Sequence, residues 1–234
     1  MDLSNTIIAL DKQLLLFFNG SGSLFLDGLA NTLTTATTWV PLYVALLFMV
    51  LRNNDTAVKV LMVVGGAGLC VFLAGSLDDM MVKPIVARWR PTHDNEIGRL
   101  VDVVNGYRGG HYGFFSAHAS NTFSIAVFFS LLVRNRLLSV FLVLWSLANC
   151  WTRMYLGVHY PGDILCGLLW GGMVGTAVWW LYYYLYKKNF SKFDYVSSLY
   201  TRTGYELRDV NMVISVLVMT LVYAVFRATL FLYA

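Results

Sequence analysis

Residues 39–51 read Trp39-Val40-Pro41-Leu42-Tyr43-Val44-Ala45-Leu46-Leu47-Phe48-Met49-Val50-Leu51, without a single charged side chain. Neighbouring residues extend this apolar run to about 30–52. A helix needs roughly 20 mainly apolar residues to cross a bilayer. The stretch therefore predicts a transmembrane helix, and with it a fold that is built inside a membrane.

Five more apolar stretches of membrane-spanning character follow along the chain. They cover residues 57–80, 117–133, 137–155, 161–186 and 211–233. The stretch 117–133 is the shortest of them and is polar at its start. Together with 30–52 they predict an all-α integral membrane protein, a bundle of six transmembrane helices. We find no repeat and no linker, so residues 1–234 are interpreted as a single membrane-embedded domain.

The composition leads to the same class of protein. Of the 234 residues, 58% are hydrophobic and only 13% are charged, whereas a soluble domain has about 25% charged residues. The net charge of +4 is spread along the chain without a basic run, so we expect no nucleic-acid partner. The cysteines Cys70, Cys150 and Cys166 are isolated in apolar segments and lack metal-binding spacing, which favours simple packing roles.

A shorter apolar segment precedes the first span. It runs over residues 7–18, is interrupted by Asp11 and Lys12, and ends at Asn19-Gly20-Ser21-Gly22. This length is insufficient to cross a bilayer, so we expect an N-terminal interfacial helix, with a short buried helix as the alternative. The first residues lack a basic region and a small-residue cleavage site, so no signal peptide is predicted.

Two polar stretches, residues 81–116 and 187–210, fall on opposite sides of a six-span bundle. Seven basic residues lie on the side of 81–116 and nine on the other side. Setting aside Lys83, Arg90 and Arg153 as members of a polar site leaves four against nine. The positive-inside rule then predicts that 81–116 is on the outer face and that 187–210 is a cytoplasmic loop.

Three short clusters bring chemistry into this apolar chain. They are Lys83-Pro84-Ile85-Val86-Ala87-Arg88-Trp89-Arg90-Pro91, then Phe115-Ser116-Ala117-His118, then Thr152-Arg153 with His159 and Asp163 close behind. Lys83 and Arg90 are two helical turns apart, so one helix face is expected to carry both, up to Pro91. Asp79 precedes Lys83 by one turn and is expected to hold its ammonium group.

Two of the clusters fall where apolar helices are predicted to begin. Ser116 and His118 open the span 117–133, while His159 and Asp163 flank the start of 161–186. A helix amino terminus offers unpaired N–H groups and a partial positive charge, which together favour an anion. One helical turn separates His159 from Asp163, so the carboxylate can hold one ring nitrogen and leave the other as a nucleophile.

Taken one at a time, these features have ordinary explanations. The basic segment 83–90 would suit contact with lipid headgroups, Arg153 would suit a helix end that reaches the interface, and the histidines would suit structural positions. The predicted topology, however, places the charged residues of all three clusters on one side of the membrane. That arrangement favours a single phosphate-binding site with its own nucleophile and acid.

The pattern Lys-x6-Arg-Pro, Ser-x-His and Arg-x5-His-x3-Asp resembles the type 2 phosphatidic acid phosphatase superfamily, which also includes vanadium haloperoxidases and glucose-6-phosphatase-like enzymes. The motifs span residues 83–163. The resemblance implies a helical bundle and a phosphatase that uses no metal ion and no other cofactor.

The resemblance also implies roles for individual residues. His159 would attack phosphorus and form a phosphohistidine, Asp163 would orient His159, and His118 would protonate the leaving oxygen. The phosphate oxygens would be held by Lys83, Arg90, Ser116, Arg153 and the Ala117 amide.

Some residues depart from the family pattern or stand outside it. Phe115, Ala117 and Thr152 occupy positions where proline, glycine and serine are common, and none of these changes removes a group that the chemistry needs. His93 and His111 match no motif position and are expected to be substrate-side or solvated residues. The role of Arg227, inside the last apolar run, is left open.

Beyond the motifs, a stripe of small residues continues from Asp163 in steps of four. It consists of Gly167, Gly171 and Gly175. Small residues at this spacing let a neighbouring membrane helix approach closely. We therefore expect the helix that carries the site to pack tightly against another helix.

The preferred function is a membrane phosphatase that acts on a lipid phosphate or diphosphate. Undecaprenyl diphosphate and a lipid A-type phosphate rank level, ahead of phosphatidylglycerophosphate and phosphatidic acid, and residues 92–115 are expected to select the headgroup. The expected location is a bacterial inner membrane with the site on the periplasmic face. A lipid phosphotransferase with the same residues is one alternative, and a non-catalytic membrane transporter is another. No oligomeric state is predicted.

Overall fold

The computed structural model describes residues 3–190 and 198–232. Within them the chain is helical, with two isolated β-bridges and no β-strand, so the predicted all-α class is confirmed. The α-helices are α1 (Leu3–Phe18), α2 (Leu24–Thr34), α3 (Val40–Arg52), α4 (Ala57–Val71), α5 (Lys83–Val86), α6 (Ala117–Val133), α7 (Arg136–Tyr155), α8 (Pro161–Asn189) and α9 (Leu207–Leu230). Short 3-10 turns lie at Ala36–Trp39, Pro91–His93 and Val104–Gly106, and π-helical turns lie at Phe72–Ser76 and Asp78–Val82.

Four helices of the described chain are long and apolar enough to cross a membrane. They are the continuous helix Ala57–Val86, formed by α4, the π-helical turns and α5, together with α7, α8 and α9. A fifth span results if α2 and the helix Ala36–Arg52, which meet at a bend of 68°, are counted as one. The predicted bundle of six would also need α6, which is apolar but has only 17 residues.

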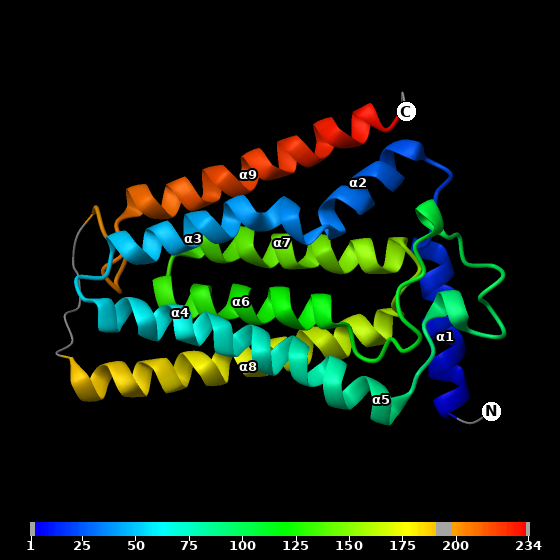
Figure 1. The fold of residues 1–234 in the computed structure, drawn as a ribbon, viewed down its shortest axis with the longest axis horizontal. Coiled ribbons are helices and arrows are strands. Elements are labelled where there is room, and N and C mark those ends of the chain that lie inside the picture. The colour runs from blue at the N-terminus through cyan, green and yellow to red at the C-terminus, as the bar shows by residue number, and fades with distance from the viewer. Residues whose placement is uncertain (1–2, 191–197, 233–234) are drawn as a thin grey trace.

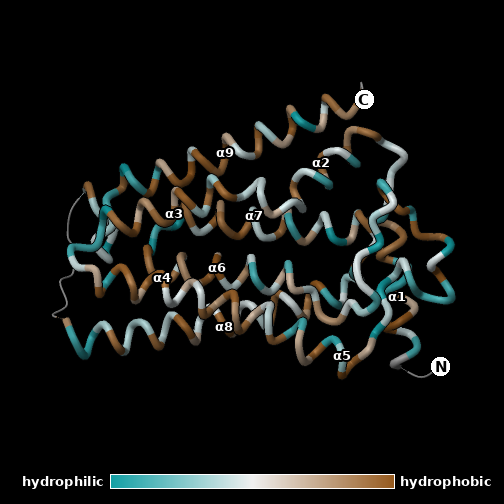
Figure 2. The backbone as a smooth tube through the Cα atoms, in the orientation of Figure 1, coloured by the Kyte–Doolittle hydropathy of each residue, from teal (hydrophilic) through white to brown (hydrophobic). Residues whose placement is uncertain are grey.

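The long helices run side by side, while α1 lies across one end of the bundle (Figure 1). Polar residues gather at the two ends, and apolar residues dominate the helices between them (Figure 2). Helix α6 packs against α4, α7 and α8, and large side chains such as Trp39, Phe128 and Trp145 fill the core. The loops that follow α5 lie at the same end of the bundle as α1.

The first predicted span is broken rather than continuous. Helix α2 ends at Thr34, and the indole N–H of Trp39 donates to the Leu33 carbonyl oxygen over 2.8 Å. The break opens a groove of about 730 Å³ between α2, α3 and α9, lined by residues that include Thr38, Val216 and Arg227. Arg227, unexplained by the sequence, therefore lines a groove near the end of α9.

The prediction that Lys83 and Arg90 share one helix face was wrong. The helix ends at Val86, and Ala87 follows in the left-handed conformation with φ of 49°. Beyond it the chain is extended, and the Arg90 N–H donates to the His111 carbonyl oxygen over 2.9 Å. Arg90 therefore reaches the site from a loop that is paired with the segment around Tyr112.

The loop predicted at 187–210 is shorter than expected, because α8 continues to Asn189 and α9 begins at Leu207. The lysines Lys187 and Lys188 therefore belong to the last turn of α8. Cations in that position interact favourably with the negative end of the helix dipole.

Small residues let α8 lie directly against the backbone of α6. A Cβ atom added at Gly167 would lie 2.7 Å from the Ser116 carbonyl oxygen, and one added at Gly175 would lie 2.6 Å from that of Ser124. At Gly171 it would collide with the Ser120 carbonyl oxygen. The predicted close packing of this glycine stripe is confirmed. It fixes the start of α8 next to the start of α6.

Candidate active site

His159 lies in the short connection between α7 and α8, and only 1% of it is exposed. Its Nε2 atom lies 3.1 Å from Arg90 Nη1, and its Nδ1 atom lies 3.6 Å from Asp163 Oδ2. A guanidinium group can only donate hydrogen bonds, so Nε2 must offer its lone pair to Arg90. The proton of the neutral ring is then on Nδ1, facing Asp163.

The surroundings of His159 are strongly cationic. Its burial, followed by the charges of Arg90, Arg153 and Lys83, holds the pKa of His159 well below its usual range. The imidazole is therefore neutral near pH 7 and keeps a lone pair on Nε2. Burial and the charge of Arg153 also lower the pKa of Arg90, since cations crowd together here. A phosphate dianion would relieve that repulsion.

Asp163 sits fully buried in the first turn of α8. Its Oδ2 atom accepts the backbone N–H of Tyr160 over 3.0 Å, which caps the helix. Its Oδ1 atom accepts from Arg88 Nη1 over 2.7 Å. The distance of 3.6 Å to His159 is too long for a hydrogen bond in this state. Contacts of this kind often tighten only when substrate is bound.

Lys83 is held by two carboxylates from the preceding turns. The predicted ion pair with Asp79 is present, and a second one joins Lys83 Nζ to Asp78 Oδ2 over 3.1 Å. Asp78 is fully buried and also accepts the backbone N–H of Phe115 over 3.2 Å. The sequence did not single out Asp78, which stands five residues before Lys83 in a π-helical turn.

Arg153, at the end of α7, is 2% exposed. Its Nη1 atom donates to Thr34 Oγ1 over 2.6 Å, and its Nη2 atom donates to the Tyr107 hydroxyl over 3.2 Å. Its Nε atom is buried and has no partner among the described residues. Arg153 therefore has a buried donor to spare, and its charge contributes to the lowered pKa of His159. Such an arginine is suited to hold an anion.

The start of α6 completes the cluster. Ser116 is the N-cap, and its backbone N–H donates to the Asp163 carbonyl oxygen over 3.1 Å. The amides of Ala117 and His118 have no intrahelical acceptor at these positions, so they are available to an anion. Arg153, His159, Lys83 and Arg90 all interact electrostatically with His118 in the first turn of this helix. The residues predicted for the site therefore converge at one end of the bundle.

Two residues that the sequence did not assign also belong to this network. Arg88 lies between Asp163 and Asp11, a residue of α1 whose Oδ2 atom accepts from Arg88 Nη2 over 2.6 Å. Arg88 was visible within the basic segment, but nothing in the sequence indicated its partners. The sequence separation of 77 positions between Arg88 and Asp11 explains why.

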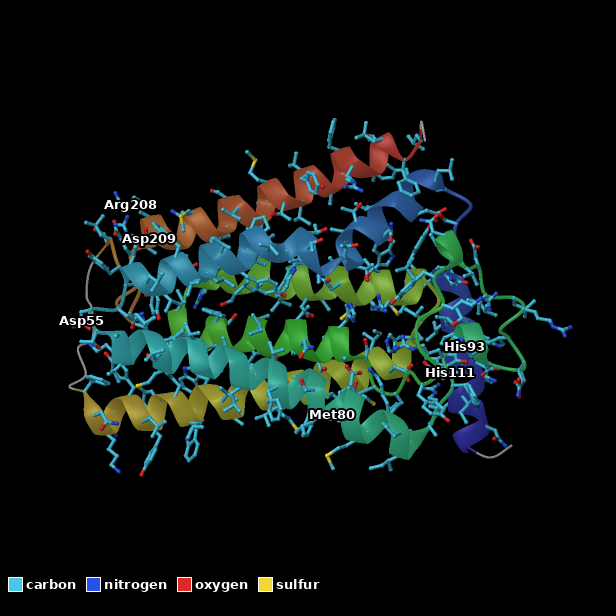
Figure 3. The ribbon with its side chains drawn as sticks, viewed as in Figure 1. Asp55, Met80, His93, His111, Arg208 and Asp209 are labelled. Atoms are coloured by element: carbon cyan, nitrogen blue, oxygen red, sulfur yellow. The ribbon has the colours of Figure 1, made fainter. Side chains whose placement is uncertain are left out.

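His93 and His111 lie outside the cluster, on the loop beside α1 (Figure 3). Their rings are 5.3 Å apart, and the Thr92 hydroxyl is 3.1 Å from His93 Nδ1. Burial and the nearby charges of His111, Arg108 and Arg90 lower the pKa of His93. These contacts agree with a position at the rim of the site, and a role toward substrate stays a prediction.

Comparison with known proteins identifies the class to which this fold and site belong. The model of the PAP2 superfamily, the type 2 phosphatidic acid phosphatases, matches residues 56–187. The chain belongs to this superfamily, and the resemblance drawn from the three motifs is confirmed.

Two curated relatives narrow the comparison. The chain is 43% identical to a protein of Bacteroides thetaiotaomicron named lipid A 4'-phosphatase, over 76% of this chain and 78% of that protein. It is 35% identical to a protein of the same name from Porphyromonas gingivalis, over 76% of this chain and 75% of that one. No solved structure matches the chain. The family and these relatives make the protein a membrane lipid phosphatase, a hydrolase of phosphoric esters in a bacterial membrane.

Proposed function

We propose that this lipid phosphatase removes a phosphate from a lipid A-type glycolipid and that His159 is its nucleophile. One observation carries the proposal: a neutral, buried imidazole presents Nε2 to a cluster of cations that includes Arg90, 3.1 Å away. The names of the two relatives favour the lipid A-type substrate over undecaprenyl diphosphate, which ranked level from sequence alone.

The proposed reaction has two steps. His159 Nε2 forms a bond to phosphorus while the P–O ester bond breaks, and the leaving oxygen takes a proton from His118. Asp163 faces Nδ1 and stabilises the positive charge that develops on the ring of His159. Water then gives a proton to His118 and attacks the phosphohistidine, which breaks the N–P bond and releases phosphate.

The phosphate oxygens are assigned to five groups around the nucleophile. They are the side chains of Lys83, Arg90, Ser116 and Arg153, and the amide of Ala117. Phosphoryl transfer depends mainly on positioning and on stabilisation of charge at these oxygens. When substrate enters, Arg90 is expected to exchange its contact with His159 for a contact with phosphate.

We further propose that six spans cross the membrane, with the broken α2–α3 pair and the shorter α6 each counted as one. The site then opens on the outer, periplasmic face of the inner membrane, where the positive-inside rule puts it. Helix α1 lies in the interface: Leu10 and Phe17 are exposed apolar residues, while Asp11 and Lys12 bind the loops of the site. The groove of about 730 Å³ beside Thr38 and Val216 has room for part of a lipid substrate.

The test uses purified protein in detergent with a panel of lipid phosphates. Lipid A bisphosphate should release phosphate faster than undecaprenyl diphosphate, phosphatidylglycerophosphate or phosphatidic acid. His159→Ala should abolish release, EDTA should leave the rate unchanged, and vanadate should inhibit. Equal release by wild type and His159→Ala would contradict the assigned nucleophile.

Analysis of the products separates the alternative activities. A phosphotransferase would move the phosphate to a second lipid rather than to water, and a transporter would release none. Recovery of inorganic phosphate in proportion to the dephosphorylated lipid is expected.

A further inference from the structure

A single arginine connects a carboxylate of α1 to the carboxylate beside the candidate nucleophile. Arg88 Nη1 donates to Asp163 Oδ1 over 2.7 Å, and Arg88 Nη2 donates to Asp11 Oδ2 over 2.6 Å. The guanidinium lies over the ring of Tyr160, with its central carbon 4.2 Å from the ring centroid. Its orientation is therefore fixed by two acids and an aromatic ring.

Asp11 makes a second contact at the start of α8. Its Oδ1 atom accepts the backbone N–H of Gly162 over 2.7 Å, directly before Asp163 in the chain. A Cβ atom added at Gly162 would lie 2.9 Å from Asp11 Oδ2. Glycine at this position lets the carboxylate approach the helix terminus, where negative charge is favourable. Asp11 Oδ1 thus contacts the helix that carries Asp163, and Asp11 Oδ2 contacts Arg88, which donates to Asp163.

The charges of these three residues bear on the reaction. Asp163 alone would stabilise the positive ring that forms when His159 attacks, but a neighbouring Arg88 would cancel much of that effect. Asp11 compensates Arg88, so the group of three keeps one net negative charge. Burial opposes the charge of Arg88, but Asp163 and Asp11 outweigh it and raise its pKa.

We propose that Asp11 is a positioning residue for the reaction, which acts through Arg88 to orient the Asp163 carboxylate toward His159 and to preserve its negative charge. This inference rests on the proposed role of His159. It gives α1 a part in the chemistry besides its contact with the membrane.

The other charged groups that face His159 come from different elements. They are Lys83 of α5, Arg90 of the loop after α5, Arg153 of α7 and His118 of α6. None of them is bonded to Asp11, whose carboxylate contacts Arg88 and Gly162. A change of pH profile on substitution of Asp11 therefore reports on the path through Arg88.

The neighbouring residue Lys12 provides a matched control. Lys12 Nζ lies 2.8 Å from Glu96 Oε2 and 3.3 Å from Asp94 Oδ2, so it also fastens α1 to the loops of the site. It makes no contact with Arg88 or Asp163. If α1 served only as an attachment, Lys12→Met would reduce activity as Asp11→Asn does.

Asp11→Asn keeps an oxygen for Gly162 but removes the negative charge and the oxygen that accepts from Arg88. We expect kcat to fall about tenfold while KM changes by less than about twofold. The acid limb of kcat/KM should move to lower pH, because an uncompensated Arg88 lowers the pKa of His159 further. Lys12→Met should retain the wild-type pH profile.

A double-mutant cycle tests the path. In an Arg88→Gln background, Asp11→Asn should have an effect of less than about twofold, since its connection is already lost. Three results would overturn the proposal. The rate losses of Asp11→Asn and Arg88→Gln could multiply in the double variant, the acid limb of kcat/KM could stay unshifted in Asp11→Asn, or Lys12→Met could lose as much activity as Asp11→Asn.

A variant that keeps the carboxylate, Asp11→Glu, distinguishes a loss of the charge from a loss of folding. Thermal unfolding in detergent is measured for every variant. Asp11→Glu should recover most of the rate and the wild-type acid limb of kcat/KM. A folded Asp11→Glu enzyme that stays slow would also overturn the proposal. Wild type and His159→Ala are assayed alongside. An inactive wild type, or an active His159→Ala, would instead indicate failure of the proposed function.

Discussion

Lys83 depends on two adjacent carboxylates of different character. The side chain of Asp79 is 61% exposed, whereas that of Asp78 is fully buried between Lys83 and the Phe115 amide. The i, i+4 rule predicts the first contact from sequence. The second depends on π-helical turns, which place residues five apart on the same side of the helix.

Removal of Asp78 is expected to destabilise the protein more than removal of Asp79. Asp78→Ala leaves the ammonium of Lys83 without its buried partner and leaves the Phe115 N–H unpaired. Breaking a buried pair costs about 3 kcal/mol of unfolding free energy, whereas an exposed pair contributes less than about 1 kcal/mol. Chemical denaturation in detergent measures both variants, and equal losses for Asp78→Ala and Asp79→Ala would contradict the assignment.

Protonation of His159 predicts a dependence of stability on pH. Its pKa is depressed in the folded protein by burial and by Arg90, Arg153 and Lys83, so below about pH 6.5 the unfolded chain binds a proton that the folded one does not. Stability therefore falls as the pH drops, by about 1.4 kcal/mol per unit until the folded pKa is reached.

His159→Gln isolates that contribution, because glutamine has no proton to gain. Unfolding free energies of both proteins are measured from pH 7.5 to pH 5. The wild type should lose stability more steeply than the variant as the pH falls. Parallel curves would mean that His159 protonates equally in the folded and unfolded states.

At the scale of helices, the sequence predicts where apolar segments lie better than where they bend or end. The segments near 137–155 and 161–186 became α7 and α8 because long apolar runs leave few alternatives in a membrane. Nothing in the sequence predicted the break after Thr34 or the left-handed conformation of Ala87. Both depend on contacts elsewhere in the fold, such as that between Trp39 and the Leu33 carbonyl oxygen.

The same distinction applies to the site. Arg90, Arg153 and His159 were predictable because their motif spacing is specific, and the structure brings them together. The pairing of Arg88 with Asp11 and Asp163 was not predictable, because the partners are 77 and 75 positions apart in the sequence. Sequence spacing reveals neighbours within one helix but not partners that tertiary folding selects.

The glycine stripe of α8 makes a testable prediction about how helices position the site. Gly171→Leu pushes a side chain into the backbone of α6 at Ser120 and should destabilise the protein by about 1 to 3 kcal/mol. Activity should fall as well, since α8 carries Asp163. Thermal unfolding and the rate of phosphate release are measured together.

The adjacent glycine is the control for this variant. A Cβ atom at Gly172 would meet only the ring of Phe123, at 3.2 Å, and a side chain can shift where a backbone cannot. Gly172→Ala should therefore stay within about 1 kcal/mol of wild type, helped by the higher helix propensity of alanine. A stable, fully active Gly171→Leu enzyme would remove the stripe from the account of the site.

Over the whole molecule, charged groups separate into two ends. The cationic site and α1 share one end, while Arg52 binds Asp209 over 3.4 Å at the other, where Figure 3 shows Asp55, Arg208 and Asp209. Apolar helices separate the two (Figure 2). This division is what a protein with one face on each side of a bilayer requires.

The proposed orientation predicts opposite labelling of the two ends. Cys70, Cys150 and Cys166 are first replaced, and a single cysteine is then introduced at Glu96 or at Arg208, whose side chains are 79% and 69% exposed. In spheroplasts, a membrane-impermeant maleimide should label Glu96→Cys directly. Arg208→Cys should react only after the membrane is permeabilised.

A reporter fused after Ala234 tests the span count independently. Six spans with the site outside place the carboxyl terminus outside, because α9 starts at the cytoplasmic end and crosses once. An odd number of spans would place the carboxyl terminus and the amino terminus on opposite sides of the membrane. A cytoplasmic signal from the fusion, together with labelling of Arg208→Cys in intact spheroplasts, would reverse the orientation and move the proposed site to the cytoplasmic face. A cytoplasmic signal with unchanged labelling would instead mean that α9 does not complete its crossing.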